Sequence, residues 1–249
     1  MTKLSVNVNK IATLRNTRTI DLPNVARLAA IALDAGADGI TVHPRPDQRH
    51  IRAEDVPAIA AVLAGYPHAE YNIEGNPFHG LGEHCARVRP AQATLVPDAR
   101  EAFTSNHGWN LVELGAVERQ ALARSIEALH GCGCRVSLFV DPIPEMMPIA
   151  RDIDADRIEL YTEPYASAAA AGKADASLAS YRAAAEAARA AGLGINAGHD
   201  LNLVNLGPFL QIVGPVDEVS IGHALIADAL ELGLAETVRR YRALCRPGR

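Results

Sequence analysis

The sequence has few lysines, few cysteines and no excess of positive charge. Only three of its 24 cationic residues are lysines, Lys3, Lys10 and Lys173, which limits any mechanism that requires a lysine Schiff base. The four cysteines lack the spaced pairs of a zinc-finger site. The formal net charge of −5 excludes a nucleic-acid binder that relies on bulk positive charge, so we expect no nucleic-acid partner.

Long hydrophobic runs are also missing from the sequence. No stretch approaches the roughly 18 consecutive apolar residues that suggest a transmembrane helix. The first residues lack the apolar core of a secretory signal. We therefore expect a cytoplasmic protein with reduced thiols and no membrane partner.

The sequence is rich in alternation between short apolar runs and longer segments with helical periodicity. Strands are predicted at residues 4–8, 39–42, 70–73, 93–96, 136–140, 157–161, 194–197 and 218–221. Eight strand–helix units in 249 residues favour a closed (β/α)8 TIM barrel over an open doubly wound sheet. No G-x-G-x-x-G motif follows the first strand, which argues against a dinucleotide-binding sheet. We expect residues 1–249 to form a single α/β barrel domain with a few extra helices.

Polar residues gather where the predicted strands end, which is where barrel enzymes place their chemistry. They are Asn7, Asn9 and Lys10 after the first strand, His43, Arg45 and His50 after the second, Glu74 after the third, Thr104 beyond the fourth, Glu159 in the sixth, His199 and Asp200 after the seventh, and Gly222 and His223 after the eighth. Histidine titrates near neutral pH, so opposed His and Glu side chains suit a series of proton transfers. The convergence of these side chains on one rim predicts an active site.

Two features of this rim predict phosphate binding. Glycine–histidine pairs follow the seventh and eighth strands, and the second pair leads into a predicted helix whose free N–H groups favour an anion. Arg18, Arg45 and Arg49 are candidates for a second phosphate, because a guanidinium matches the geometry of phosphate oxygens. A set of solvated surface arginines is the alternative interpretation.

Four segments carry a resemblance to a known family. VNVNKIATLRN at residues 6–16, GITVHPR at 39–45, NAGH at 196–199 and IGHA at 221–224 closely resemble the pyridoxine 5′-phosphate synthases of the deoxyxylulose-phosphate-dependent route to vitamin B6. The resemblance extends over the whole chain, in order and with similar spacing. It implies a (β/α)8 barrel that condenses 3-amino-2-oxopropyl phosphate with 1-deoxy-D-xylulose 5-phosphate, without a metal or an organic cofactor. It also implies a homo-octamer.

The resemblance implies a role for each candidate residue. His43 and Glu74 match the family's proton acceptors, His199 matches its proton donor, and Glu159 matches a further carboxylate of the site. The matches to substrate-binding residues are Asn7, Gly222 and His223 for the aminoketone phosphate, and Arg18, Arg45, His50 and Thr104 around the two phosphates. Because the imine of this reaction forms between the two substrates, no enzyme lysine is required, which suits the scarcity of lysine.

This chain departs from the family pattern at two places in the predicted site. Asn9 and Lys10 replace an Asp-His pair that normally contacts the sugar phosphate, and Lys10 could bind that phosphate as a point charge. Asp200 stands where a glycine is common, which places a carboxylate beside a possible phosphate contact. We interpret both changes as variation that retains the activity.

Other functions remain open from the sequence. A phosphosugar aldolase would use Lys10 as its Schiff-base amine, which borohydride trapping would reveal. A metal-dependent hydrolase is less favoured, because the first strand ends in Asn7-x-Asn9 and not in a pair of histidines. An inactive barrel that only binds a phosphorylated metabolite is disfavoured by the presence of His43, Glu74 and His199.

Overall fold

The eight strands form a closed parallel barrel in the computed structural model, which describes residues 1–100, 102 and 104–246. The strands are β1 (Lys3–Asn7), β2 (Gly39–Val42), β3 (Glu70–Gly75), β4 (Gln92–Leu95), β5 (Arg135–Val140), β6 (Arg157–Tyr161), β7 (Gly194–Gly198) and β8 (Glu218–Ile221). Each strand pairs with the next, and β1 also pairs with β8, with Val6 opposite Ile221. The predicted (β/α)8 barrel is confirmed, and each predicted strand overlaps the observed one.

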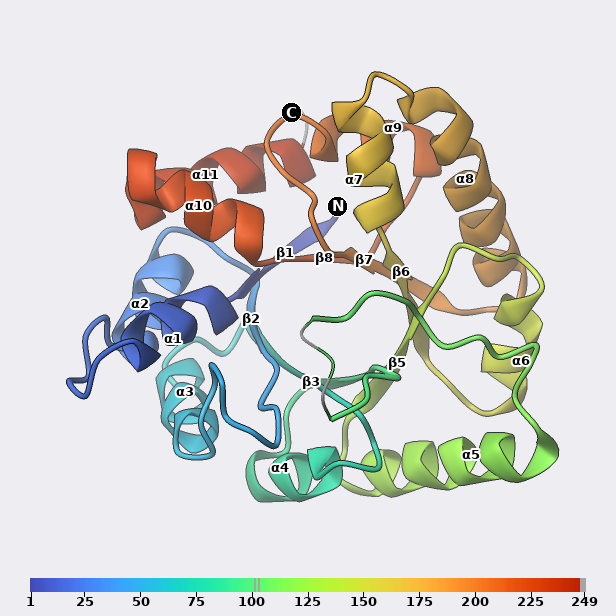
Figure 1. The fold of residues 1–249 in the computed structure, drawn as a ribbon, viewed down its shortest axis with the longest axis horizontal. Helices are drawn as coiled ribbons and strands as arrows, with labels where there is room; N and C mark the ends of the chain where they lie inside the picture. The colour runs from blue at the N-terminus through green and yellow to red at the C-terminus, as the bar shows by residue number, and fades with distance from the viewer. Residues whose placement is uncertain (101, 103, 247–249) are drawn as a thin grey trace.

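Helices surround the barrel on its outside (Figure 1). Within the described residues they are α1 (Asn9–Asn16), α2 (Val25–Asp34), α3 (Asp55–Leu63), α4 (Leu81–Val88), α5 (Ala116–Gly131), α6 (Met146–Asp152), α7 (Glu163–Ala170), α8 (Ala174–Ala190), α9 (Leu206–Val213), α10 (His223–Leu232) and α11 (Leu234–Cys245). None of these helices is both long and apolar enough to cross a membrane.

The helices α1 and α7 are additions that the sequence pattern does not predict. The inward face of α1 includes Arg15, so it lacks the apolar stripe of an amphipathic helix. In α7 only Tyr165 is buried, within a run of alanines. Because α1 begins at Asn9, Asn9 and Lys10 lie in a first helical turn directly after β1.

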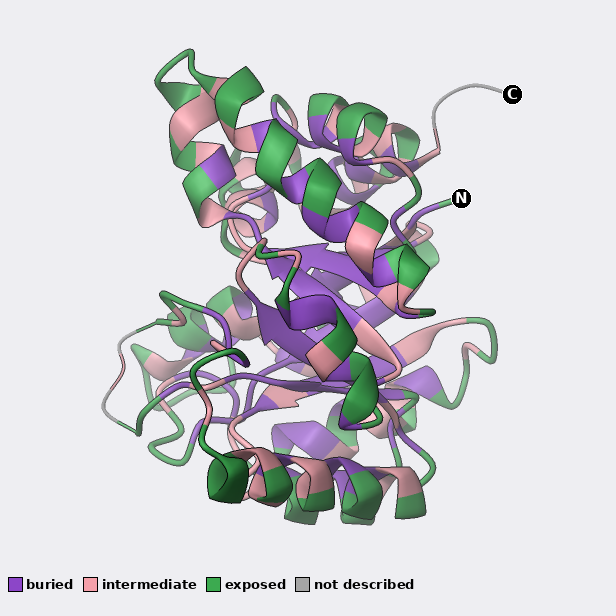
Figure 2. Ribbon diagram, turned by 90° about the vertical axis from the view of Figure 1, so that its right-hand side faces the viewer, coloured by how far each residue is buried: buried purple, intermediate pink, exposed green. Residues whose placement is uncertain are grey.

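The strands have an apolar face toward the helices and a polar face toward the barrel axis. Figure 2 shows the strands as mostly buried, between helices whose outer sides are exposed. Inside the barrel, Ser5 Oγ lies 2.7 Å from Thr41 Oγ1, and Thr94 Oγ1 donates to Asn72 Oδ1 at 3.1 Å. Since successive side chains of a strand point to opposite faces, the residues between these polar ones pack outward against the helices. The interior is therefore largely polar and surrounded by an apolar layer, with a small apolar cluster of Val96, Phe139 and Tyr161.

Charged groups occupy the N-terminal end of this interior. Lys3 and Arg135 both form ion pairs with Glu70. Gln92 Nε2 donates to Glu218 Oε1 at 3.3 Å. Burial raises the pKa of Glu218 to about 7, and the nearby Glu70 adds to the shift. Glu218 is therefore a buried carboxyl that resists ionisation.

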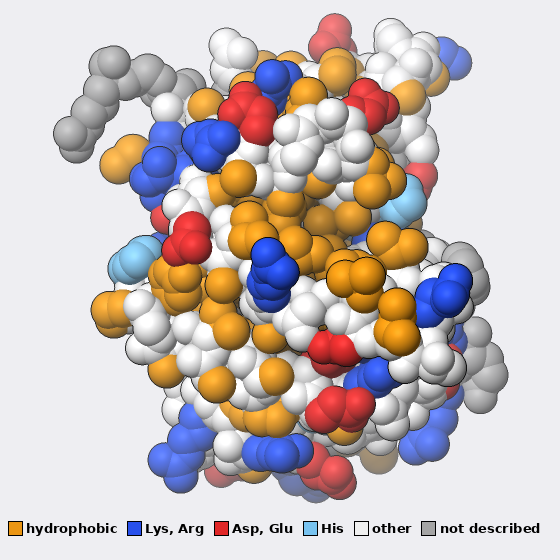
Figure 3. Space-filling view, turned by 90° about the vertical axis from the view of Figure 1, so that its left-hand side faces the viewer, with side chains coloured by type: hydrophobic (Ala, Val, Ile, Leu, Met, Phe, Trp, Pro, Cys, Tyr) orange, Lys and Arg blue, Asp and Glu red, His pale blue; other side chains and the backbone are white. Residues whose placement is uncertain are grey.

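One side of the molecule exposes large apolar side chains. Figure 3 shows a band of hydrophobic side chains across the face that carries α1, α2 and α10. Leu14, Ile20, Leu22 and Leu230 lie on these elements and on the connection between α1 and α2, with exposed fractions of 53%, 55%, 66% and 79%.

Candidate active site

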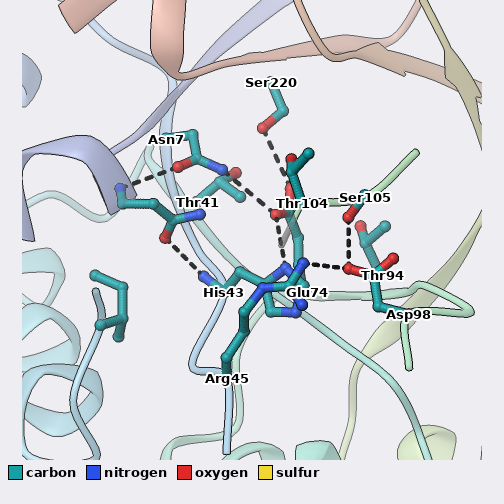
Figure 4. Close-up of polar contacts among 12 residues, drawn as sticks. Asn7, Thr41, His43, Arg45, Glu74, Thr94, Asp98, Thr104, Ser105 and Ser220 are labelled. Carbon is teal, nitrogen blue, oxygen red and sulfur yellow. Dashed lines mark hydrogen bonds and ion pairs between the residues drawn. The ribbon is translucent and has the colours of Figure 1, made fainter. Parts of the chain in front are cut away.

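His43 and Glu74 form a pair at the C-terminal end of the barrel (Figure 4). His43 directly follows β2, and its Nδ1 lies 3.9 Å from Oε2 of Glu74, which stands near the end of β3. Asn7, the last residue of β1, donates from Nδ2 to the same Glu74 oxygen at 3.3 Å. Its Oδ1 accepts from the Asn9 N–H at 3.0 Å, while Asn9 Oδ1 accepts from the His43 N–H at 2.9 Å. The turn from β1 into α1 therefore holds both members of the pair.

Burial shifts the pKa values of this pair in opposite directions. Desolvation lowers the pKa of His43 well below its ordinary value, and the positive charge of Arg45 adds to the effect. Burial raises the pKa of Glu74 to about 8, with the nearby Asp98 carboxylate adding to the shift. Both side chains are therefore largely neutral near pH 7: an imidazole that can accept a proton lies beside a carboxyl group that still carries one.

Glu159 lies in the barrel interior, on β6, within electrostatic reach of Glu74. It is 3% exposed, and its Oε2 lies 3.4 Å from Thr94 Oγ1. Burial raises the pKa of Glu159 well above its ordinary value, with Glu74 adding to the shift. The neighbouring Gly198 leaves space for this carboxyl group, because a Cβ there would lie 2.4 Å from Glu159 Oε1. Gly198, which the sequence predicts in a phosphate-binding loop, is therefore also required by its packing against Glu159.

Arg45 and His50 lie on the connection between β2 and α3. Arg45 faces the segment that follows β4, and the His50 ring lies edge-on to His43, with ring centroids 6.1 Å apart. Arg45 forms an ion pair with Asp98, and its Nη1 donates to the Ala102 carbonyl at 3.1 Å. Arg49 Nη1 donates to the same carbonyl at 2.9 Å. The Nδ1 of His50 accepts from the next backbone N–H at 2.9 Å, and burial lowers the pKa of this histidine to about 4. Arg45 and Arg49, two of the predicted phosphate-binding residues, thus hold the segment after β4 against the site.

Arg15 anchors the same connection and is absent from the sequence prediction. Its guanidinium is buried on α1 and contacts Asp55 through two bonds, Nη1–Oδ1 at 2.5 Å and Nη2–Oδ2 at 2.9 Å. Nη2 also donates to the His50 carbonyl at 3.1 Å. The available signal was spacing, because Arg15 follows Ile11 by four residues and therefore shares its buried helix face.

His199 and Asp200 follow β7 with positive φ angles of 86° and 63°. Nδ1 of His199 lies 2.7 Å from Asp200 Oδ2, and Nε2 lies 3.5 Å from Thr104 Oγ1. The His199 ring also packs edge-on against Tyr161, with ring centroids 5.2 Å apart. The segment after β4 therefore reaches across the end of the barrel to β7.

The remaining predicted binding residues divide into two groups. Gly222 precedes α10, and a Cβ there would lie 3.1 Å from Asn7 Cβ, so glycine permits this close approach. His223 and Lys10 are exposed at the first turns of α10 and α1, and both are close enough to help lower the pKa of Asp200. Arg18 differs from these residues: it is exposed between α1 and α2, and within the described residues no contact joins its side chain to the site.

The fold and the site define an enzyme that handles protons with buried His and Glu side chains at the end of a (β/α)8 barrel. The family model described as "Pyridoxal phosphate biosynthesis protein PdxJ" matches residues 4–247. The chain belongs to this family, the pyridoxine 5′-phosphate synthases. It is 50% identical to the pyridoxine 5′-phosphate synthase of Albidiferax ferrireducens over 253 residues, covering 100% of this chain and 99% of that one. It is 52% identical to that of Xanthomonas axonopodis pv. citri over 254 residues, covering 99% and 98%.

Solved structures with little sequence similarity share the fold. Thiamine phosphate pyrophosphorylase from Pyrococcus furiosus has a TM-score of 0.62 at 14% identity, over 98% of this chain and 95% of that one. Mycobacterium tuberculosis tryptophan synthase has a TM-score of 0.66 at 12% identity, over 99% and 93%. At these identities the likeness concerns the barrel alone.

Proposed function

We propose that the site performs the family's reaction by acid–base catalysis. In it, 3-amino-2-oxopropyl phosphate and 1-deoxy-D-xylulose 5-phosphate give pyridoxine 5′-phosphate, inorganic phosphate and water. The amine of one substrate forms an imine with the ketone of the other, so the enzyme supplies proton acceptors and donors. The observation that carries this proposal is the buried His43–Glu74 pair, with Nδ1 and Oε2 3.9 Å apart and opposed pKa shifts.

Each of the titratable groups has a separate role in this proposal. His43 accepts a proton as a neutral imidazole, because its lowered pKa keeps it unprotonated. Glu74 accepts a proton once it has ionised. His199 donates a proton to a leaving hydroxyl or phosphate group. Glu159 keeps a neutral carboxyl group in the interior, since burial and Glu74 both disfavour its ionisation.

We assign the two substrate phosphates to different sides of the site. The N-terminus of α10 offers free N–H groups to the aminoketone phosphate, with Asn7, Gly222 and His223 around it. The sugar phosphate would contact Arg45, His50 and Thr104 together with Asn9 and Lys10, with the Asp200 carboxylate close by. Holding both substrates in register supplies the entropic part of catalysis.

We also propose a homo-octamer in the cytoplasm. The exposed apolar band of Leu14, Ile20, Leu22 and Leu230 supports burial against other copies of the chain. A cytoplasmic location fits substrates that carry phosphate charges and do not cross membranes unaided. Light scattering should give about eight times the chain mass of 26.5 kDa, and a monomer mass at assay concentrations would contradict the octamer.

The direct test is synthesis of pyridoxine 5′-phosphate by the purified protein from the two substrates, followed by chromatography. We expect product without added metal. Absence of product at saturating substrate would contradict the proposed reaction. Borohydride should trap no substrate on Lys10, and a Lys10 adduct would favour an aldolase instead.

Glu74→Gln tests the role of the buried carboxyl group. This substitution retains the shape and the hydrogen bonds of the side chain but cannot accept a proton, so turnover should fall by roughly 10²–10⁴-fold. The matched control is Glu83→Gln, which changes an exposed carboxylate on α4 and should leave turnover unchanged. Near-normal turnover of Glu74→Gln, with an unaltered circular dichroism spectrum, would remove Glu74 from the mechanism.

A further inference from the structure

His199 and Asp200, which directly follow β7, make a side-chain contact that neighbouring residues of a regular strand seldom make. Successive side chains of a strand point to opposite faces, so neighbouring residues seldom touch. Here Nδ1 of His199 lies 2.7 Å from Oδ2 of Asp200. The positive φ angles of the two residues, 86° and 63°, turn the backbone so that both side chains meet. Two consecutive residues other than glycine rarely adopt such angles.

Hydrogen bonds from two other segments maintain this backbone. Thr162 Oγ1, directly after β6, lies 2.6 Å from the His199 carbonyl oxygen and 2.7 Å from that of Gly198, so its hydroxyl hydrogen is shared between them. Asn205 Nδ2, directly before α9, donates to the Asp200 carbonyl at 3.2 Å. Both residues are buried and neither is among the predicted site residues. A disfavoured backbone that is held from several sides is typical of functional sites.

The charge of Asp200 determines which atom of this contact carries the hydrogen. The hydrogen bond from His199 holds the pKa of Asp200 below its ordinary value, and the charges of His223 and Lys10 act in the same direction. An ionised carboxylate only accepts hydrogen bonds, so the hydrogen must lie on Nδ1. Nε2 is therefore the ring nitrogen left for the substrate, and it lies on the side of Thr104, 3.5 Å from Oγ1.

We propose that Asp200 is a positioning residue that fixes the ring orientation and the tautomer of His199, so that Nε2 faces the substrate. This inference rests on the proposed role of His199 as the proton donor. Asp200 acts on the reaction through His199, much as a carboxylate orients the histidine of a hydrolase triad. With its hydrogen held on Nδ1, the ring takes up on Nε2 a proton released from the substrates in an earlier step, and the carboxylate stabilises the imidazolium until Nε2 donates that proton to the leaving group. Lys10 and His223, which also face this carboxylate, offset its negative charge beside the phosphates.

Three variants separate the carboxylate from the backbone. Asp200→Asn removes the charge and retains the size of the side chain. Asp200→Gly removes the side chain and also relaxes the positive φ angle. Asp200→Glu restores a carboxylate on a longer side chain. The matched controls are Asp154→Asn and Asp154→Gly. Asp154 lies between α6 and β6 and also has a positive φ, 66°. Its Oδ2 lies 3.5 Å from a histidine nitrogen, Nδ1 of His130.

The first measurement is the ring tautomer of His199 in the substrate-free protein, from nitrogen-15 NMR of histidine-labelled protein. The His199 signals are identified by their loss in His199→Gln. We expect hydrogen on Nδ1 in the parent protein, a mixture of tautomers in Asp200→Asn and Asp200→Gly, and no change in either control. An unchanged tautomer in both Asp200 variants would overturn the proposal, whether or not the protein makes pyridoxine 5′-phosphate.

The second measurement compares the change in kcat with the change in KM for each variant. Loss of a partner that orients a reacting group costs roughly 10- to 100-fold. We therefore expect kcat to fall by this factor in Asp200→Asn and Asp200→Gly, with KM unchanged or lower, and to recover in part in Asp200→Glu. A raised KM with unchanged kcat would show that Asp200 binds substrate instead, and normal kcat in Asp200→Gly would also contradict a positioning role.

Discussion

His43 and Glu74 owe their opposed pKa shifts to the same cause, which is burial. Desolvation disfavours the charged form of each group, so it lowers the pKa of the base and raises that of the acid. The sequence predicts both residues, because each stands at the end of a predicted strand. It does not predict Asp98, whose charge contributes to the raised pKa of Glu74, as a site residue, because the fold of the segment after β4 decides that contact.

The raised pKa of Glu74 predicts how activity depends on pH. If ionised Glu74 accepts a proton, kcat/KM should rise with pH, with a midpoint near the pKa of about 8. Asp98→Asn removes a neighbouring negative charge, so the midpoint should move to lower pH. Profiles of kcat/KM between about pH 6 and 9.5 test this shift. Because the titration of the substrates is the same for both proteins, coincident profiles would contradict the assignment to Glu74.

At the scale of elements, the strands are predictable and two helices are not. The strands combine β-branched residues with sharp boundaries, and their apolar faces pack against the helices. In α1, however, the buried position of Arg15 depends on Asp55, 40 residues further along the chain. Sequence periodicity contains no information about such a partner. The same limit explains why Thr162, which supports the turn after β7, is absent from the prediction.

Gly198→Ala tests how closely β6 and β7 are fitted to each other. The added Cβ would lie 2.4 Å from Glu159 Oε1 and 3.2 Å from the Ser220 carbonyl oxygen. Because Glu159 is fully enclosed, we expect a loss of about 1–3 kcal/mol in the free energy of unfolding, together with reduced turnover. Urea denaturation and the synthesis assay measure the two effects.

The control for this substitution is Gly207→Ala in α9. A Cβ at Gly207 would meet only Leu244 Cδ2, at 3.8 Å, which is an ordinary contact. Alanine is also favoured over glycine within a helix by roughly 0.5–1 kcal/mol, so the variant should be as stable as the parent or more so. Equal stability of the two variants would contradict the close fit around Glu159.

At the scale of the whole molecule, the polar interior is the feature that the sequence analysis left out. Within the strands, polar residues recur at every second position, as in Ser5 and Asn7 or Asn72 and Glu74. This period of two indicates which face points inward. The pattern was therefore visible in the sequence. The hydrogen-bond partners, by contrast, depend on the stagger between strands, which only the closed barrel defines.

The buried carboxyl groups of this interior predict a stability that falls as pH rises. Burial raises the pKa of Glu218 from 4.5 to about 7, so the folded protein keeps a proton that the unfolded chain releases. The free energy of unfolding should therefore decrease between these pH values. Glu218→Gln removes this dependence, so its stability relative to the parent should improve by on the order of 2 kcal/mol from pH 5 to pH 8.

Urea denaturation of both proteins at the two pH values measures this difference. Glu231→Gln, at an exposed position of α10, is the matched control and should follow the parent at both pH values. If the Glu218→Gln and parent stabilities differ by the same amount at both pH values, the raised pKa of Glu218 is wrong.

The pairing of β1 with β8 has a consequence for the order of events during synthesis. A ribosome produces β1 first and β8 last, and the ladder in which Val6 lies opposite Ile221 joins the two. Asn7, which contacts Glu74, meets Gly222 only after that ladder has formed. Before the ribosome has produced β8, the nascent chain exposes the edges of β1 and of its last completed strand, which are sites for unwanted pairing. The N-terminus of α10, where we propose that the aminoketone phosphate binds, is therefore among the last parts of the barrel to be assembled, and the site is completed only when β8 has been made.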